Sequence, residues 1–380
     1  MRQAARTRSP ARRAAPAAGW ISALAIALGG CLPLADHTAA PAPTTPEPAT
    51  RGPAPTAPAS TSAAPAPAPG AERPGGASEP AAGQSAARAQ PLWRDPSTAA
   101  ARQLRAWDRQ GRDAEAELLR TIAGRPTAEW ISEEPRKRAR RVTEAAEAAG
   151  KTPVLVAYHI PYRDCGNHSK GGAVDAAEYR TWADELAAVI GDREALVILE
   201  PDAVAQVVDG CVLPELRGER LDLLRHAVVT LLGLPRAKVY IDAGNAGWVP
   251  DPARLVPSLQ RAGIAYADGF ALNVSNFHTT ATSTTYGQRL SRLLDGAHFV
   301  IDTSRNGNGP AGEGGHERVW CNPSGRALGE PPTTHTGRPR VDAYLWVKRP
   351  GESDGTCQGG PPAGSWWPSY ALGLARNSER

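Results

Sequence analysis

The stretch that decides the fold is Ala195-Leu196-Val197-Ile198-Leu199-Glu200-Pro201-Asp202, in which five apolar residues give way abruptly to polar ones. A continuous apolar run of this length is typical of a parallel strand that is buried on both faces. Pro201 has no N–H to donate, so the strand ends before it. Asp202 therefore lies just past the carboxyl end of a strand, where barrels and open α/β sheets place their chemistry.

Other apolar runs end in the same way. Val239–Asp242 and Phe299–Asp302 both finish on an aspartate, and Val154–Tyr158 leads into a glycine-rich loop that carries Asp164. A single aspartate at a strand end is often only a helix cap. Several of them within one β/α array are harder to explain as caps, so we predict an acidic site at the carboxyl edge of the sheet.

Strands and helices alternate along the rest of the chain. We predict strands at Val154–Tyr158, Ala195–Leu199, Lys238–Asp242, Gly269–Asn273, His298–Asp302 and Ala343–Val347, and place Trp130 in a loop. We predict helices at Ala99–Arg109, Ala114–Ile122, Arg136–Ala149, Asp175–Ile190, Leu216–Leu232, Asp251–Gly263, Tyr286–Asp295 and Trp367–Ala375. Strict alternation indicates an α/β fold with a parallel sheet and right-handed crossovers, closed or nearly closed into a barrel.

The first ninety residues differ from the rest. Five arginines, an apolar stretch from Ile21 to Leu28 and Gly29-Gly30-Cys31 have the pattern of an export signal over residues 1–30. Leu28–Cys31 also resembles a lipobox, which leaves open whether the chain is secreted or anchored by a lipid at Cys31. Residues 31–90 are rich in Pro, Ala, Thr and Ser and predict a disordered linker. We expect the folded domain at 91–380 and an extracellular or cell-surface location.

Charge and cysteine content exclude some functions. Without the five arginines before Cys31 the formal net charge changes from +4 to about −1, so no basic patch indicates a nucleic acid partner. The other cysteines are Cys165, Cys211, Cys321 and Cys357. Because they show no metal-ligand spacing, we predict two disulfides and no metal, with three pairings open on spacing alone.

Tryptophans in the loops suggest sugar chemistry. Flat aromatic faces stack on glucose rings, and a carboxyl acid can protonate a glycosidic oxygen. Trp182 and Trp346 lie in predicted elements and are expected in the core. The candidate platforms are Trp130, Trp248, Trp320, Trp366 and Trp367.

Seven motifs then occur in order across residues 91–380: Tyr158–Gly166 followed by Ser169 and Gly171-Gly172, Leu199–Asp202, Tyr240–Gly244, Asn273–Asn276, Ile301–Gly309, Trp320–Arg326 and Leu345–Gly355. In these motifs the chain closely resembles the cellulases of glycoside hydrolase family six. The resemblance implies a distorted, TIM-like parallel β/α barrel with fewer than eight strands. It also implies hydrolysis of β-1,4-glucan with inversion and without a cofactor.

The resemblance assigns catalytic roles to three aspartates. Asp202 is the expected general acid, and Asp164 is expected to raise the pKa of Asp202 and to relay a proton through water. Asp354 matches the usual candidate for the base. It is expected to pair with Arg305 and Lys348, which would make it a weak base, so the identity of the base stays open.

The resemblance also assigns binding residues and pairs the cysteines as Cys165–Cys211 and Cys321–Cys357. The residues expected to bind the substrate are Tyr158, Ser169, Trp130, Asp242, Trp248, Asn273, Trp320, Lys348 and Glu352. Asn245 departs from the family pattern, because many relatives have histidine there.

No long insertion follows Asp242 or Asp354, which favours an open cleft and cleavage of internal bonds. The expected partners are β-1,4-glucan and cello-oligosaccharides, bound by a monomer. The alternatives are a processive cellobiohydrolase, a non-catalytic glucan-binding lipoprotein and a barrel glycosidase that acts on another glycan.

Overall fold

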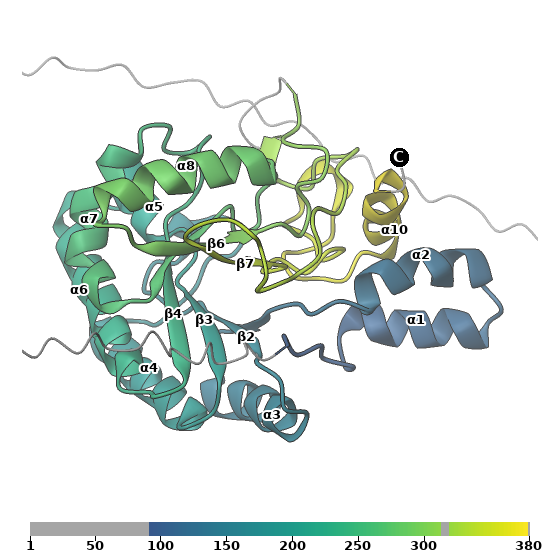
Figure 1. Ribbon diagram of the computed structural model, residues 1–380, viewed down its shortest axis with the longest axis horizontal. Coiled ribbons are helices and arrows are strands. Elements are labelled where there is room, and N and C mark those ends of the chain that lie inside the picture. The colour runs from purple at the N-terminus through teal and green to yellow at the C-terminus, as the bar shows by residue number, and fades with distance from the viewer. Residues whose placement is uncertain (1–90, 313–318, 379–380) are drawn as a thin grey trace, which may run out of the picture. The chain divides into compact units, whose positions relative to one another are not determined.

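In the part of the chain that the structure describes, seven strands form one sheet, and their order in space is their order in the chain. Every neighbouring pair is parallel. The strands are β1 (Glu129–Ile131), β2 (Val154–Ala157), β3 (Ala195–Leu199), β4 (Ala237–Asp242), β5 (Gly269–Leu272), β6 (His298–Asp302) and β7 (Val341–Leu345). Helices cover the outside of the curled sheet (Figure 1), so the α/β prediction is confirmed.

This computed structural model describes residues 91–312 and 319–378. All of them belong to one compact unit, Ala81–Arg380. The predicted export signal, Cys31 and the predicted linker lie outside the described residues. Within the described residues, no helix has the length and apolar character needed to cross a membrane.

The two edges of the sheet come close together. Among the described residues no strand ladder joins β7 to β1, but the Ala128 N–H donates to the Trp346 carbonyl at 3.0 Å. The indole Nε1 of Trp130 adds a bond of 3.0 Å to the Val347 carbonyl. The sheet is therefore a distorted barrel with fewer than eight strands, as predicted.

The structure corrects the prediction that Trp130 lies in a loop. It is the central residue of β1, which pairs in parallel with β2. A strand of three residues is too short to show a period in the sequence, so only the pairing with β2 defines it. The sequence prediction of six strands is wrong by this one strand.

The helices largely follow the prediction: α1 (Ala99–Arg109), α2 (Asp113–Ala123), α3 (Pro135–Ala148), α4 (Ala176–Ile190), α5 (Ala203–Asp209), α6 (Pro214–Leu232), α7 (Val256–Arg261), α8 (Thr280–Leu293) and α10 (Pro368–Asn377), with short 3-10 turns at Asp164–Gly166, Pro252–Leu255, Ile264–Tyr266 and Cys357–Gly359. Helix α8 begins six residues before the predicted start at Tyr286. Its first turns are rich in threonine, which disfavours helix, but the Thr279 side chain caps them by accepting from the Thr282 N–H. The short helix α5 was not predicted.

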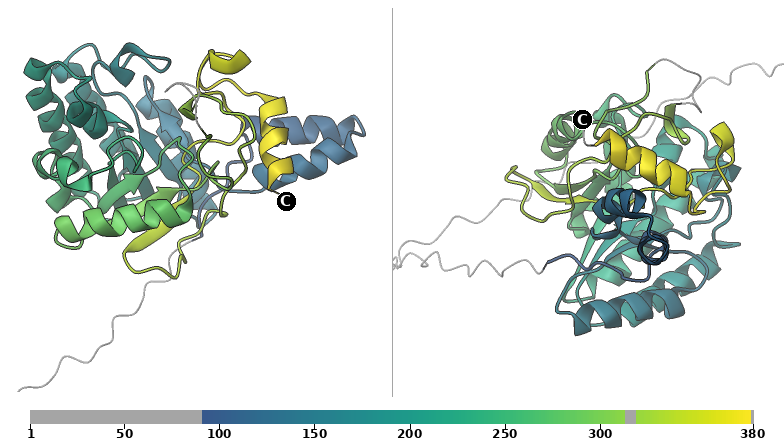
Figure 2. Two further views of the ribbon diagram at one scale, coloured as in Figure 1. Left: turned by 90° about the horizontal axis from the view of Figure 1, so that it is seen from above. Right: turned by 90° about the vertical axis from the view of Figure 1, so that its right-hand side faces the viewer.

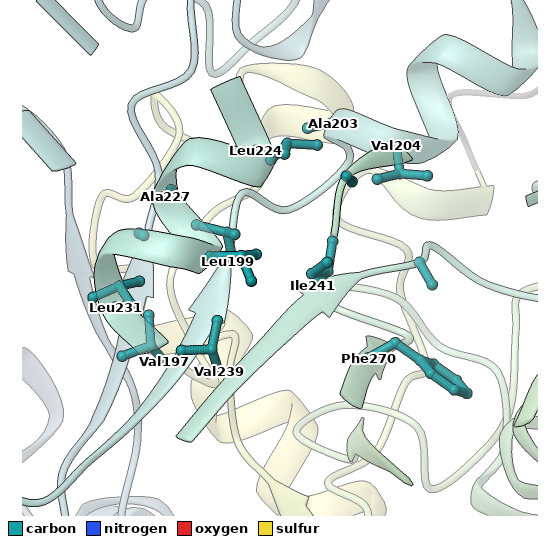
Figure 3. Packing of buried hydrophobic residues seen from close by; sticks show 14 of the residues in the cluster. Val197, Leu199, Ala203, Val204, Leu224, Ala227, Leu231, Val239, Ile241 and Phe270 are labelled. Atoms are coloured by element: carbon teal, nitrogen blue, oxygen red, sulfur yellow. The ribbon is translucent and has the colours of Figure 1, made fainter. Parts of the chain in front are cut away.

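Helix α6 packs on the outer face of the sheet. Leu224 and Leu231 of α6 lie over Val197 and Leu199 of β3 in the main hydrophobic core (Figure 3). This packing sets the beginning of α6 near the carboxyl end of β3. A second cluster joins α1, α2 and α10 at one side of the domain (Figure 2).

Two disulfides fix loops at the carboxyl edge of the sheet. They pair Cys165 with Cys211 and Cys321 with Cys357, at Cα–Cα distances of 6.3 and 6.2 Å. Both predicted pairings are confirmed.

Candidate active site

Asp202 lies at the carboxyl edge of the sheet. It follows β3 by three residues, adopts a left-handed conformation with φ of 73°, and is half-buried at the start of α5. Although it occupies the capping position of α5, its side chain makes no capping hydrogen bond. A left-handed backbone in a residue other than glycine is costly and is often found at functional sites. The Asp202 carboxyl group is therefore not used to cap α5.

The surroundings of Asp202 favour its protonated form. Burial raises its pKa well above the ordinary value, and the negative charges of Asp242 and Asp164 raise it further. Asp242 is in direct contact: its Oδ2 accepts from the Asp202 N–H at 2.9 Å and from the Gly244 N–H at 3.1 Å. Its Oδ1 is buried and has no hydrogen-bond partner. The sequence predicted repulsion from Asp164 alone, whereas the structure gives burial and Asp242 the larger effects.

Asp164 lies in a strained loop after β2. Three non-glycine residues there have positive φ angles: Tyr162 (54°), Asp164 (56°) and Cys165 (46°). The Asp164 Oδ2 accepts from the Ser169 N–H at 2.7 Å, which closes the loop on itself. Burial raises the pKa of Asp164, although this hydrogen bond opposes the shift. Ser169 therefore positions Asp164 through its backbone, and its predicted contact with substrate stays a prediction.

Tyr158 connects this loop to the barrel. Its ring is buried, packs edge-on against Trp130 at 5.0 Å and lies under the Arg163 guanidinium at 4.5 Å. Burial and the charges of Asp202 and Asp164 raise its pKa, so the phenol stays protonated. Arg163, for which the sequence predicted no role, also donates to the carbonyls of Tyr158 and Ser169 at 2.6 and 2.8 Å.

Asp354 is the most strongly paired carboxylate of the site. It is 7% exposed, and its oxygens lie 2.8 Å from Arg305 Nη1 and 3.1 Å from Lys348 Nζ. Asn322 adds a backbone N–H at 3.0 Å. Burial alone would raise the pKa of Asp354, but the two positive charges outweigh it and hold the pKa below its usual range. Both predicted ion pairs are present, and they make Asp354 a weak proton acceptor.

Two further carboxylates accept hydrogen bonds from the backbone N–H groups of loops. Glu200 accepts from the N–H groups of His159 and Ile160 at 2.9–3.0 Å. Asp302 accepts from four N–H groups at 2.9–3.2 Å, those of Ser275, Ser304, Val347 and Lys348. Both side chains are 1% exposed. Although Asp302 ends a strand as Asp242 does, it organises the loops around the site instead of facing it.

Two asparagines hold the loops after β4 and β5. Asn273 is fully buried, and its side chain bonds the backbone of His278 and the Asp302 carbonyl at 2.8–3.1 Å. A direct contact with substrate would require these bonds to open. Asn245, which departs from the family pattern, accepts from the N–H groups of Gly247 and Trp248 at 3.0 Å and so shapes the loop that carries Trp248.

Three further predicted binding residues make contacts of their own. The Trp248 Nε1 donates to Asp209 at 2.6 Å, and Trp320 packs against His168 with ring centroids 5.9 Å apart. Glu352 accepts from Arg349 at 3.0 Å. All three predicted binding residues are partly exposed, as contact with a ligand requires.

One group of residues has metal-ligand spacing in the part of the chain that the structure describes. The ligand atoms of His168, Cys321 and Cys357 lie within 4.8 Å of one another. Because the two sulfurs form a disulfide, they offer no thiolate to a metal.

A model of the family described as glycosyl hydrolases family 6 matches residues 87–378. Endoglucanase A of Cellulomonas fimi is 48% identical over 289 residues, which cover 75% of this chain and 60% of that protein. Endoglucanase 1 of Streptomyces halstedii is 41% identical over 292 residues, covering 74% and 87%. The chain spans only 60–64% of the length of several such relatives.

A solved structure agrees with these matches. The endoglucanase Cel6 from Mycobacterium tuberculosis, in complex with methyl-cellobiosyl-4-deoxy-4-thio-β-D-cellobioside, superposes with a TM-score of 0.71 at 44% identity. The match covers 77% of this chain and 99% of that chain.

Proposed function

Because this chain belongs to glycosyl hydrolases family 6, we propose that it is an inverting β-1,4-glucanase that cleaves internal bonds of cellulose or related glucans. The observation that carries the proposal is Asp202, a half-buried carboxyl group that makes no capping bond and is surrounded by other carboxylates. Such a group keeps its proton near neutral pH and can give it to a glycosidic oxygen.

Asp202 acts as the general acid. Its proton passes to the oxygen of the departing sugar as the glycosidic bond breaks, and a water molecule attacks from the opposite face of the ring. The negative charge left on Asp202 is destabilised by Asp242 and Asp164, so the proton is easily regained from solvent.

The attacking water must lose a proton. Asp354 is poorly suited to accept it, because Arg305 and Lys348 stabilise its charged form. Asp164 is the better acceptor, because its pKa is raised and its carboxylate accepts from the backbone N–H of Ser169 instead of facing two positive charges. We assign it the relay of this proton through water.

Cleavage within chains is supported by the names of the similar proteins and by the short loops. The bacterial relatives at 41–48% identity are named endoglucanases. The connection from Asp242 to Trp248 has no long insertion that could roof the cleft. Export through residues 1–30, with or without a lipid at Cys31, fits a polymeric substrate that cannot enter the cell.

The test is hydrolysis of soluble carboxymethyl-cellulose, followed by viscosity and by reducing ends. A fast fall in viscosity with few new ends supports internal cleavage, whereas slow thinning with many cellobiose units would identify a processive enzyme. Proton NMR of a fresh cello-oligosaccharide digest should show the α-anomer first. Initial β-anomer would refute inversion, and no hydrolysis of any β-1,4-glucan would refute the function.

A further inference from the structure

Arg220 is a charged residue on the buried face of α6. It lies one turn before Leu224 and shares a face with Ala227 and Leu231, which pack on β3 (Figure 3). Its side chain is only 4% exposed. A buried arginine needs strong compensating interactions, so its partners are informative.

Arg220 joins the two segments that carry the catalytic carboxyl groups. Its Nη2 donates to the carbonyls of Pro161 and Tyr162, both at 2.9 Å, in the loop that leads to Asp164. Its Nη1 donates at 3.0 Å to Oε1 of Gln206 on α5, the helix that begins directly after Asp202. The Gln206 N–H in turn bonds the Asp202 carbonyl at 2.9 Å. One guanidinium thus connects both segments.

The Pro161–Cys165 segment needs such an anchor. Its positive φ angles at Tyr162, Asp164 and Cys165 are unfavourable for these residue types and persist only where surrounding contacts enforce them. The disulfide to Cys211 holds the far side of the segment, and Arg220 holds the side next to β2.

The charge of Arg220 is also unusual. All three of its acceptors are neutral oxygens, so within the described residues it has no carboxylate at ion-pair distance. Its charge acts instead on the surrounding acids, which include Asp202 and Glu200, and on the phenols of Tyr158 and Tyr179.

Several charges act on Asp202. Asp242, Asp164 and Asp209 raise its pKa together with burial, and Arg220 lowers it. Tyr158, which also lies in the field of Asp202, is neutral. The guanidinium therefore opposes the carboxylates that keep Asp202 protonated.

We propose that Arg220 is a positioning residue of the active site, which holds the Asp164 loop against the helix that follows Asp202 and balances the negative charge around the acid. The inference rests on the proposed function, because it assigns Asp202 and Asp164 their catalytic roles. No part of Arg220 needs to touch the substrate.

The test compares three variants of the full chain. Arg220→Gln removes both the positive charge and the paired Nη1 and Nη2 donors of the guanidinium. Arg220→Lys keeps the charge but not the paired donors. The control is Arg217→Gln, one turn earlier on the same helix. Arg217 also donates to a loop carbonyl, but to that of Val212 at 2.9 Å, whereas the bonds to Pro161 and Tyr162 come from Arg220. Hydrogen exchange of residues 161–166, kcat, KM and the pH profile are measured on each.

Arg220→Gln should exchange faster at 161–166, lose roughly 10- to 100-fold in kcat with little change in KM, and move the alkaline limb of the pH profile to higher pH. Arg220→Lys should lose less kcat than Arg220→Gln, and the alkaline limb of its pH profile should stay at the parent position. Arg217→Gln should match the parent protein. If Arg220→Gln does not fold, faster exchange and lower kcat in Arg220→Lys support the proposal.

Parent-like exchange and kcat in the Arg220 variants would overturn the proposal. A fall in kcat for Arg220→Gln with an unmoved alkaline limb would also overturn it, because a merely structural residue would behave in that way. If the parent protein hydrolyses no β-1,4-glucan, the proposed function fails, while the exchange data still show whether Arg220 anchors the loop.

Discussion

The buried pair of Asp354 with Arg305 offers the most quantitative test of the site. Asp354→Asn keeps the shape of the side chain and can keep the bond from the Asn322 N–H, but it removes the charge that balances Arg305 and Lys348. Arg305 is 0% exposed, so it cannot turn to solvent. Removing one partner of a buried ion pair costs about 3–5 kcal/mol. At about 2–4 °C per kcal/mol this predicts a fall in Tm of roughly 6–20 °C at pH 7.

The effect should depend on pH with a definite sign. The folded-state pKa of Asp354 is lowered, so its stabilisation is present above the unfolded value of about 3.9 and is lost as the pH falls through the folded pKa. The difference in Tm between the variant and the parent protein should therefore shrink below about pH 4.

Differential scanning calorimetry between pH 3 and 8 measures both quantities. Asp222→Asn is the matched control, because Asp222 forms a comparable pair with Arg261 at 2.9 Å that is about half exposed on both sides. Solvent screens such pairs, so its Tm should hardly change. If Asp354→Asn unfolds within about 2 °C of the parent protein at pH 7, the reasoning from the buried ion pair is refuted.

Three further predictions concern the acid and its loops. Asp202→Asn should lose nearly all activity on unactivated β-1,4-glucan and still bind cello-oligosaccharide, while aryl glucosides with good leaving groups are spared, which steady-state kinetics and calorimetric titration can check. Asp242→Asn should shift the alkaline limb of the pH profile to lower pH, because it removes a negative charge that raises the pKa of Asp202; a limb at higher pH would contradict this. Replacing both Cys165 and Cys211 by serine should cost on the order of 2–4 kcal/mol in denaturant unfolding and lower kcat through the Asp164 loop; unchanged values for both would argue against the disulfide's role.

Much of the fold could be predicted because most elements carry a strong local pattern. The run from Ala195 to Leu199 is buried along its whole length, and β6 has the predicted bounds His298–Asp302. Helix α4 begins after Asp175, whose side chain accepts from the Glu178 N–H, as a capping residue should. The pattern is missing in β1, which depends on pairing with β2, and in the seven residues of α5.

The site could be predicted only in part, because carboxylates that follow similar strands have different hydrogen-bond partners. Asp202, Asp242 and Asp302 occupy similar places in the sequence, yet Asp302 accepts four backbone N–H groups, Asp242 accepts two, and the Asp202 side chain makes no capping bond. Gly244 and Ser304 donate from two residues further along the chain, but the other four donors come from loops that are distant in the chain. Whether such a group reacts or holds the backbone is therefore decided by the tertiary structure and not by its position in a motif.

Arg220 shows the reverse case, in which the sequence held a usable signal. The apolar face of α6 repeats through Leu224, Ala227 and Leu231, and Arg220 falls on the same face one turn earlier. A charge at such a position predicts a buried group with polar partners, because an unpaired one would destabilise the helix packing. Sequence motifs predict the candidate catalytic carboxylates. A charged residue that interrupts an apolar face instead indicates a buried group with polar partners. Here that residue is Arg220, whose hydrogen bonds connect α6 to the Asp164 loop and to α5.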